Sequence, residues 1–110
     1  MGLIFSLTLI SSLIIKGRVI DDVTGELIYY AQIVLDEIKR GTTSDPSGDF
    51  ELKNIPPGKY TLSVHYLGYE IYRKILELKE GRVPYIVVRL KKNTSLSSEG
   101  DRSNRYTTTF

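Results

Sequence analysis

The sequence predicts an all-β domain, a small antiparallel β-sandwich, from two observations. Turn-forming glycine, proline and aspartate residues recur every ten to sixteen residues, at Thr24–Glu26, Gly41–Phe50 and Ile55–Tyr60. The segments between these turns alternate apolar and polar side chains, as strands do when one face lies in a core and the other in solvent. The glycine, proline and aspartate residues therefore serve the turns, and few residues of the chain are candidates for catalysis or binding.

Length and composition limit the possible classes of protein. The chain has 110 residues, of which 41% are hydrophobic, and this suffices for one domain with a modest core. A formal net charge of +2, with both signs mixed along the chain, gives no indication of nucleic-acid binding. The chain has no cysteine, which excludes disulfides, thiolate metal sites, a cysteine nucleophile and a lipid anchor on cysteine.

The amino-terminal residues form an apolar leader. Leu3–Ile15 holds thirteen residues without a charge. This is shorter than the roughly 20 apolar residues that span a bilayer, and it matches the hydrophobic region of a signal peptide. We expect residues 1–13 to be a signal peptide or apolar leader, with export to the periplasm or outer membrane. Against this, no Lys or Arg precedes the run, and Ile10–Ile15 is alternatively the start of the first strand.

The first four strands are expected at Ile14–Ile20, Leu27–Asp36, Thr42–Ser44 and Asp49–Lys53. In the first, Ile15, Gly17 and Val19 share one face, and Gly25 lies in the turn that follows. In the second, two sets of side chains alternate: Ala31, Ile33 and Leu35 against Tyr30, Gln32 and Val34. The third and fourth are joined by a tight turn, with Asp45 to cap the backbone and Gly48 in the left-handed conformation.

The last three strands are expected at Lys59–Leu67, Tyr69–Leu78 and Pro84–Leu90. A rigid turn with Pro57 and Gly58 precedes the first of them, and Gly68 marks a bulge or corner after it. The core face of the fifth strand is predicted to hold Tyr60, Leu62, Val64 and Tyr66, and its polar face Lys59, Thr61, Ser63 and His65. In the seventh, Ile86, Val88 and Leu90 alternate with Val87 and Arg89. Residues 92–110 form a polar tail that is predicted to be disordered.

No active site is expected. His65 is the only histidine and lies on the polar face of a strand, where a solvated role is usual. Asp21, Asp22 and Glu26 bracket a turn and form an alternative calcium site, although turns favour aspartate in any case. Asp45 and Asp49 around Gly48 have the same two interpretations. The sequence contains no phosphate-binding loop, catalytic carboxylate pair or nucleophile elbow, so no catalytic residue, metal or cofactor is predicted.

Tyrosine is the one abundant residue with binding potential. The chain holds eight tyrosines, and aromatic rings stack on sugars as well as filling strands. Three of them are the candidates for ligand contact: Tyr29, Tyr69 and Tyr72. The sequence does not decide between a binding role and a packing role for these rings.

The turns, in this order, resemble those of the carboxypeptidase-regulatory-like domain. The matching segments are Ile15–Asp21, Thr24–Ile28, Ala31–Leu35, Gly41–Asp45, Gly48–Phe50, Ile55–Leu62 and Tyr66–Glu70. The resemblance covers residues 14–91. It implies a seven-stranded Greek-key sandwich of the transthyretin (prealbumin) type with no catalytic activity.

In bacteria such a domain often precedes TonB-dependent, SusC-like outer-membrane receptors, and Tyr66–Tyr69 is most similar to that group. The resemblance implies an exported accessory module, free-standing or part of such a receptor. Its partners would be other proteins or a receptor domain that follows covalently, with no nucleic acid.

Two alternatives remain open. One is a carbohydrate-binding module that uses exposed tyrosines. The other is an adhesin or stalk domain locked by an isopeptide bond between Lys16 and Asn93, with Glu51, Glu70 or Glu77 as the acid.

Overall fold

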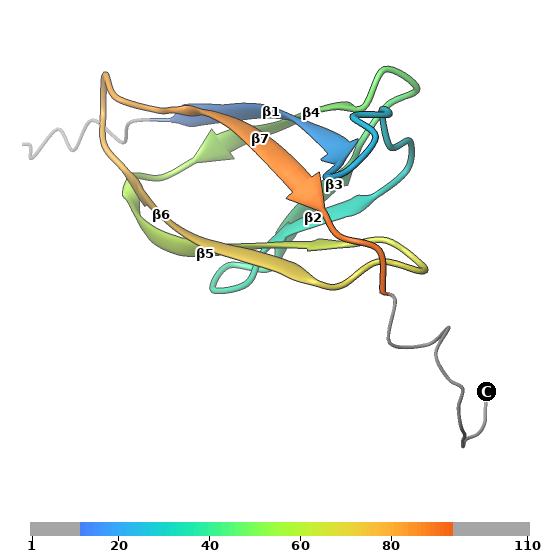
Figure 1. Cartoon of the computed structure of the whole chain (residues 1–110). Helices are drawn as coiled ribbons and strands as arrows, with labels where there is room; N and C mark the ends of the chain where they lie inside the picture. Colours follow the sequence, from blue (N-terminus) through green and yellow to red (C-terminus); the bar gives the residue numbers. More distant parts are fainter. Residues whose placement is uncertain (1–11, 94–110) are drawn as a thin grey trace, which may run out of the picture.

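The computed structural model describes residues 12–93 and folds them into two β-sheets (Figure 1). The strands are β1 (Leu13–Asp21), β2 (Gln32–Leu35), β3 (Arg40–Thr43), β4 (Asp49–Ile55), β5 (Gly58–His65), β6 (Tyr72–Leu78) and β7 (Tyr85–Leu90). One sheet has the order β4-β1-β7 and the other β3-β2-β5-β6. The all-β class and the seven strands are confirmed. Within residues 12–93, no helix is long and apolar enough to cross a membrane.

The expectation of a wholly antiparallel fold is wrong at one pair of strands. β1 and β7 run parallel, with Lys16 opposite Tyr85 and Asp21 opposite Leu90. The chain returns from β6 through residues 79–84 at the end of the sandwich where β1 begins, so β7 points the same way as β1 (Figure 1). Alternation fixes which side chains face inward, but it does not identify the neighbouring strand.

The core lies between the two sheets. Of the core residues predicted on the fifth strand, Tyr60, Leu62 and Val64 are buried. On the first, second and seventh strands, one of the two alternating sets is buried: Ile15 and Val19, then Ala31, Ile33 and Leu35, then Ile86, Val88 and Leu90. Gly17 is buried as well, because the ring of Phe50 and the carbonyl of Ile86 occupy the space that a Cβ atom there would need.

Two side chains of the fifth predicted strand differ from their predicted exposure to solvent. Ser63 was assigned to the solvated face but is only 1% exposed, since its hydroxyl donates to the Asp36 carboxylate at 2.8 Å. Tyr66 was assigned to the core but is exposed. β5 ends at His65, and the chain then leaves the sheet in a turn closed by the Tyr69 amide and the Tyr66 carbonyl.

Strand lengths differ from the prediction where the backbone turns. The second strand begins at Gln32 instead of Leu27, because Tyr30 has a φ of 72° that no extended strand accommodates. The sixth begins at Tyr72 instead of Tyr69, after the turn at Gly68. The Asp45 turn forms as predicted: the Asp45 carbonyl accepts from the Gly48 amide at 2.7 Å, and Gly48 has a φ of 79°.

Both predicted terminal segments lie largely outside the described residues. The leader at 1–13 overlaps the description only at its end, where Leu13 begins β1 and is buried. The tail at 92–110 overlaps it only at Lys92 and Asn93, which still contact the fold. The strands of the sandwich run from Leu13 to Leu90.

Replacing Leu62 by alanine is expected to lower the free energy of unfolding by about 2–5 kcal/mol, because its fully buried side chain leaves a cavity in the centre of β5. His65→Ala on the same strand should cost less than about 1 kcal/mol, since that side chain is partly exposed. Urea denaturation of both variants measures the difference. A larger loss for His65→Ala would contradict the assigned faces.

Candidate functional site

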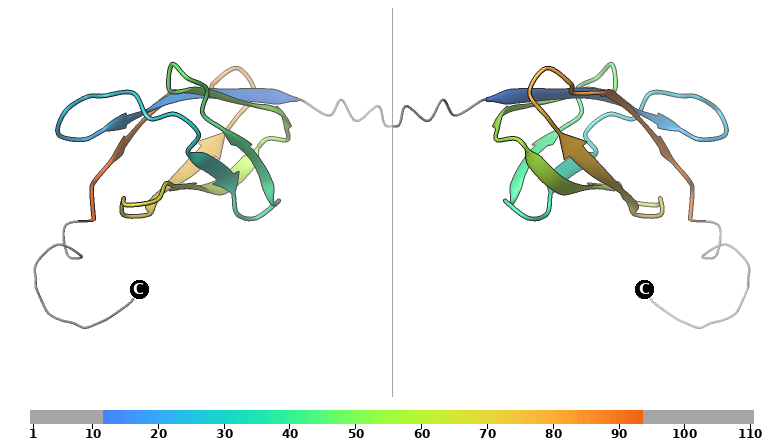
Figure 2. Two further views of the ribbon diagram at one scale, coloured as in Figure 1. Left: turned by 90° about the vertical axis from the view of Figure 1, so that its right-hand side faces the viewer. Right: turned by 90° about the vertical axis from the view of Figure 1, so that its left-hand side faces the viewer.

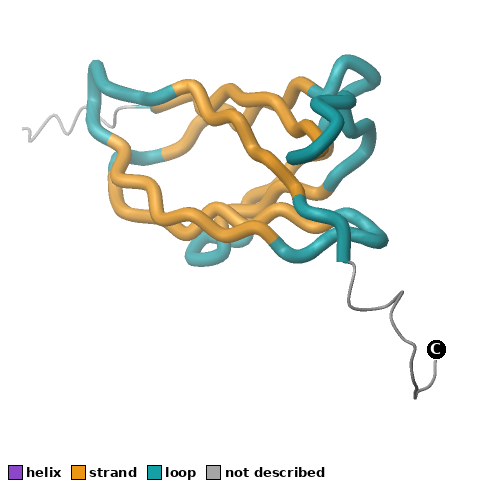
Figure 3. The backbone as a smooth tube through the Cα atoms, in the orientation of Figure 1, coloured by secondary structure: helices purple, strands orange, loops and turns teal. Residues whose placement is uncertain are grey.

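The loops at 27–31 and 66–71 lie at one end of the sandwich (Figures 1 and 3). These loops carry exposed aromatic and aliphatic side chains. We call this surface the aromatic end. Its residues are Tyr29, Tyr30, Tyr66, Leu67, Tyr69 and Ile71. Leu67 is 96% exposed and Tyr30 is 65% exposed. Large apolar side chains grouped in this way are unusual on a protein surface without a partner.

The aromatic end surrounds a shallow hollow of about 520 Å³. The lining residues combine rings and aliphatic groups with three polar side chains: Tyr30, Gln32, Thr43, His65, Tyr66, Leu67, Tyr69 and Ile71. The rings are paired: Tyr29 and Tyr30 have centroids 5.4 Å apart, and Tyr66 and Tyr69 5.6 Å apart. Both pairs are tilted, which is a favourable arrangement for aromatic rings.

Buried Ser44 holds the first loop of the aromatic end. Its hydroxyl donates to the Ile28 carbonyl at 2.8 Å and accepts from the Ala31 amide at 2.9 Å. Its carbonyl accepts from the Tyr30 amide at 3.0 Å. Together these bonds fix Tyr30 in the left-handed conformation, which costs a non-glycine residue about 1–3 kcal/mol. The Tyr30 ring is therefore presented on a rigid and strained loop.

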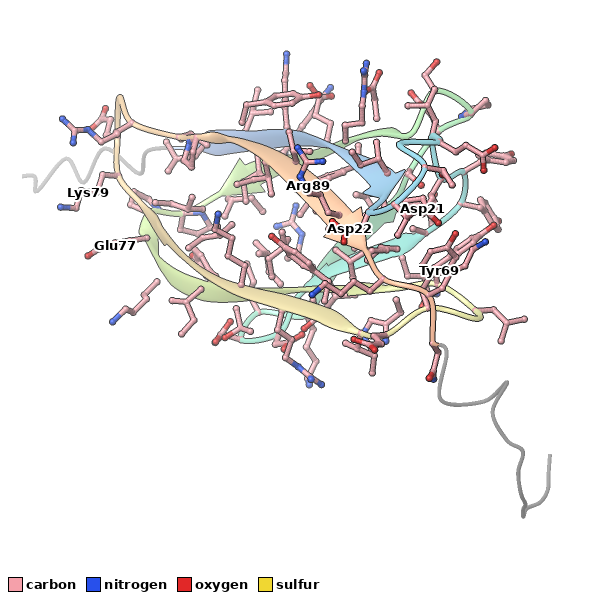
Figure 4. All side chains as sticks on the ribbon, viewed as in Figure 1. Asp21, Asp22, Tyr69, Glu77, Lys79 and Arg89 are labelled. Atoms are coloured by element: carbon pink, nitrogen blue, oxygen red, sulfur yellow. The ribbon has the colours of Figure 1, made fainter. Side chains whose placement is uncertain are left out.

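Buried Asp21 holds the second loop. The Tyr69 hydroxyl donates to Asp21 Oδ2 at 2.6 Å, and the two side chains meet at the loop end of the molecule (Figure 4). Asp21 Oδ1 accepts from the Val23 and Thr24 amides at 2.8 and 2.9 Å. One carboxylate thus joins the turn after β1 to the loop that carries Leu67.

This hydrogen bond moves the pKa values of its two partners apart. The Tyr69 hydroxyl, followed by the Thr24 amide, lowers the pKa of Asp21 to about 2. The Asp21 carboxylate, followed by burial, raises the pKa of Tyr69 to about 12. At neutral pH the carboxylate stays charged and the phenol stays neutral, so the pair acts as a structural clamp.

The three candidate tyrosines lie in different surroundings. Tyr29 is exposed at the aromatic end. Tyr69 also belongs to the aromatic end, but its hydroxyl donates a hydrogen bond to Asp21. Tyr72 begins β6 and packs against the core, and burial raises its pKa. Sequence reasoning missed four residues of the aromatic end: Tyr30, Tyr66, Leu67 and Ile71. The available signal was the position of the tyrosine pairs at turns, next to Ala31 and around Gly68.

The acidic turns are used by the backbone. Besides the bonds of Asp21, Asp45 Oδ1 accepts from the Ser47 and Asp49 amides, both at 2.9 Å. Asp49 forms an ion pair with Arg18 at 2.8 Å. In the part of the chain that the structure describes, no three His, Cys, Asp or Glu side chains are grouped to hold a metal ion.

The geometry rules out the proposed isopeptide bond. Lys16 lies opposite Tyr85 at the start of the parallel β1–β7 pair, whereas Asn93 lies eight residues beyond Tyr85. At about 3.3 Å per residue the two are roughly 25 Å apart. The Lys16 ammonium instead lies 3.6 Å from the Glu51 carboxylate, and the backbone N–H of Asn93 donates to the Gly68 carbonyl.

These features define a β-sandwich module with exposed aromatic and aliphatic side chains at one end. A family model described as the CarboxypepD_reg-like domain matches residues 15–99, and the chain belongs to that family. No curated protein matches the sequence. Among solved structures, the chain is similar to the Bacillus anthracis TIE protein, with 20% sequence identity and a TM-score of 0.60. The likeness concerns the fold alone. It covers 74% of this chain and 17% of that protein.

The Asp21–Tyr69 clamp predicts acid sensitivity. A carboxylate whose pKa is lower in the folded state than in the unfolded chain stabilises the fold above its unfolded pKa of about 3.9. This contribution is lost as the pH falls from about 5 towards 2. Tyr69→Phe should lower stability at pH 7 and flatten the loss between pH 5 and 2. Urea denaturation at several pH values measures both effects. Tyr29→Phe is the control, and equal pH profiles for the two variants would contradict the clamp.

Proposed function

We propose that the chain is an exported, non-catalytic interaction module whose aromatic end contacts a protein at the outer membrane. In this proposal it is the N-terminal domain of a TonB-dependent receptor, or a free-standing relative, with a transthyretin-like Greek-key topology. Membership of the CarboxypepD_reg-like family supports a regulatory module without catalytic activity. The observation that carries the proposal is the exposed cluster around Leu67 on rigidly held loops.

The aromatic end suits contact with a protein. Tyrosine and exposed aliphatic side chains are enriched in the centres of protein interfaces. Ser44 and Asp21 fix the two loops before binding, which lowers the entropy cost of association. Lys92 bridges to Tyr69 and the backbone N–H of Asn93 donates to the Gly68 carbonyl, so a domain joined after residue 93 would start beside this surface.

Carbohydrate is the second candidate ligand. The hollow of about 520 Å³ combines tyrosine rings with hydrogen-bonding groups of Gln32, Thr43 and His65. Sugars are bound by that combination of stacking and polar contacts. A glycan ligand would use Tyr30 and Tyr66 as stacking surfaces.

A photo-crosslinking amino acid in place of Leu67 tests the protein contact in living cells. We expect a covalent adduct with an outer-membrane receptor protein from position 67. We expect none from position 75, because Ile75 is exposed on β6, outside the aromatic end. Equal labelling from both positions, or none from position 67, would contradict the proposal. Titration with oligosaccharides, followed by tyrosine fluorescence, tests the alternative.

Export predicts a mature amino terminus near Leu13. Cleavage there removes the uncharged leader and leaves β1 complete, with the buried Leu13 and Ile15 side chains in place. Amino-terminal sequencing of the protein from fractionated cells measures both the site and the compartment. An intact Met1 or Gly2 on cytoplasmic protein would overturn this part of the proposal.

A further inference from the structure

The four edge strands of the sandwich differ in how well they are protected against pairing with another strand. β3 is only four residues long. On β4, the Arg40 guanidinium donates to the carbonyls of Lys53 and Asn54 at 2.8 and 3.3 Å. β6 carries three charged side chains, Arg73, Lys74 and Glu77. Short length, covered carbonyls and charge are the usual devices that block edge pairing.

β7 has the least protection. Its six residues, Tyr85–Leu90, include one charge, Arg89, and three β-branched side chains. On the outer face of the sheet, Tyr85 is 57% exposed and Val87 is 43% exposed. A strand with this composition at a sheet edge is a template for a further strand.

The hydrogen-bond pattern identifies which groups of β7 are free. The Leu90 carbonyl accepts from the Asp22 amide on the β1 side, whereas the Lys91 carbonyl accepts from the Glu70 amide on the other side. Successive residues of a strand alternate in direction, so Tyr85, Val87 and Arg89 point their amides and carbonyls to the open edge. Glu70 limits this open ladder at one end. The start of β7 at Tyr85 limits it at the other.

We propose that the open edge of β7 pairs with the same edge of a second copy of the chain, antiparallel and about a two-fold axis at Val87. Tyr85 then lies opposite the partner's Arg89, and Val87 lies opposite the partner's Val87. Each of these facing pairs forms two backbone hydrogen bonds, which satisfies every free amide and carbonyl of Tyr85, Val87 and Arg89.

The side chains are self-complementary in this register. Each Arg89 guanidinium meets a Tyr85 ring across the interface, an arrangement that favours cation–π contact. The two Val87 side chains meet on the axis as a β-branched cross-strand pair. A shift by two residues in one direction requires Val83, which lies before the start of β7. A shift in the other direction requires Lys91, whose carbonyl already accepts from Glu70. The Val87-centred register alone pairs all three free residues.

The proposed dimer is weak. A ladder of five residues per copy buries much less than the roughly 1,600 Å² of a standard interface. Association should therefore depend on protein concentration and appear at high micromolar concentration or above. The aromatic end has no part in this pairing, so the dimer and the proposed function stand or fall independently.

Amide hydrogen exchange of the wild-type protein, followed by NMR at increasing concentration, tests the pairing directly. Protection of the Val87 and Arg89 amides should rise at least severalfold with concentration. The Ile86 and Val88 amides face β1 and should not change. A uniform rise along β7, protection at another edge, or a protein that stays monomeric at millimolar concentration would overturn the proposal.

Sedimentation equilibrium of variants tests the register. Val87→Lys places two ammonium groups on the axis and should weaken dimerisation at least tenfold. Ile75→Lys, on the outer face of the β6 edge strand, is the matched control and should have no effect. Tyr85→Lys and Arg89→Glu should each weaken the dimer, and the double variant should recover it through two Lys–Glu pairs. A double variant no stronger than Tyr85→Lys would refute this register.

Discussion

The structure depends most on one buried carboxylate, that of Asp21, which is only 2% exposed. A buried anion is costly unless it is fully hydrogen-bonded, and Asp21 meets that requirement with two turn amides and the Tyr69 hydroxyl. These bonds join the end of β1 to a loop 48 residues away in the sequence. The position of Leu67, Tyr66 and the hollow beside them follows from that connection.

The parallel pairing of β1 and β7 is the second feature on which the structure depends, because it determines which segments lie together at each end of the sandwich. It brings Asp21 beside Leu90, so that the end of β7 and the loop at 66–71 meet at the aromatic end (Figure 2). It also keeps Lys16 and Asn93 apart, which removes the isopeptide bond. Because β1 pairs with β4 on its other side, β7 is an edge strand of this sheet.

The sequence predicted those features of the fold that depend on residues close together in the chain. The turn at Asp45 and Gly48 and the inward faces of Leu62 and Val64 follow from neighbouring side chains and alternation, and the structure has them as predicted. The aromatic end could not be predicted in the same way. Ser44 and Tyr30 are 14 residues apart, and neither shows in sequence that it forms half of a buried hydrogen-bond network. The exposure of Tyr66 depends on where β5 ends, and strand ends are the least certain part of a pattern.

The polar groups and the exposed groups at the aromatic end have separate tasks. The buried polar side chains, Asp21 and Ser44, are bonded to backbone or to Tyr69 and set the shape of the loops. The exposed ones, Tyr30 and Leu67 above all, make no bond that the fold requires. Tyr69 alone belongs to both sets, so the other exposed side chains can be exchanged without loss of the loop conformations. A scaffold of this kind presents a stable surface whose specificity is set by a few exposed residues, which is the physical requirement for an interaction module.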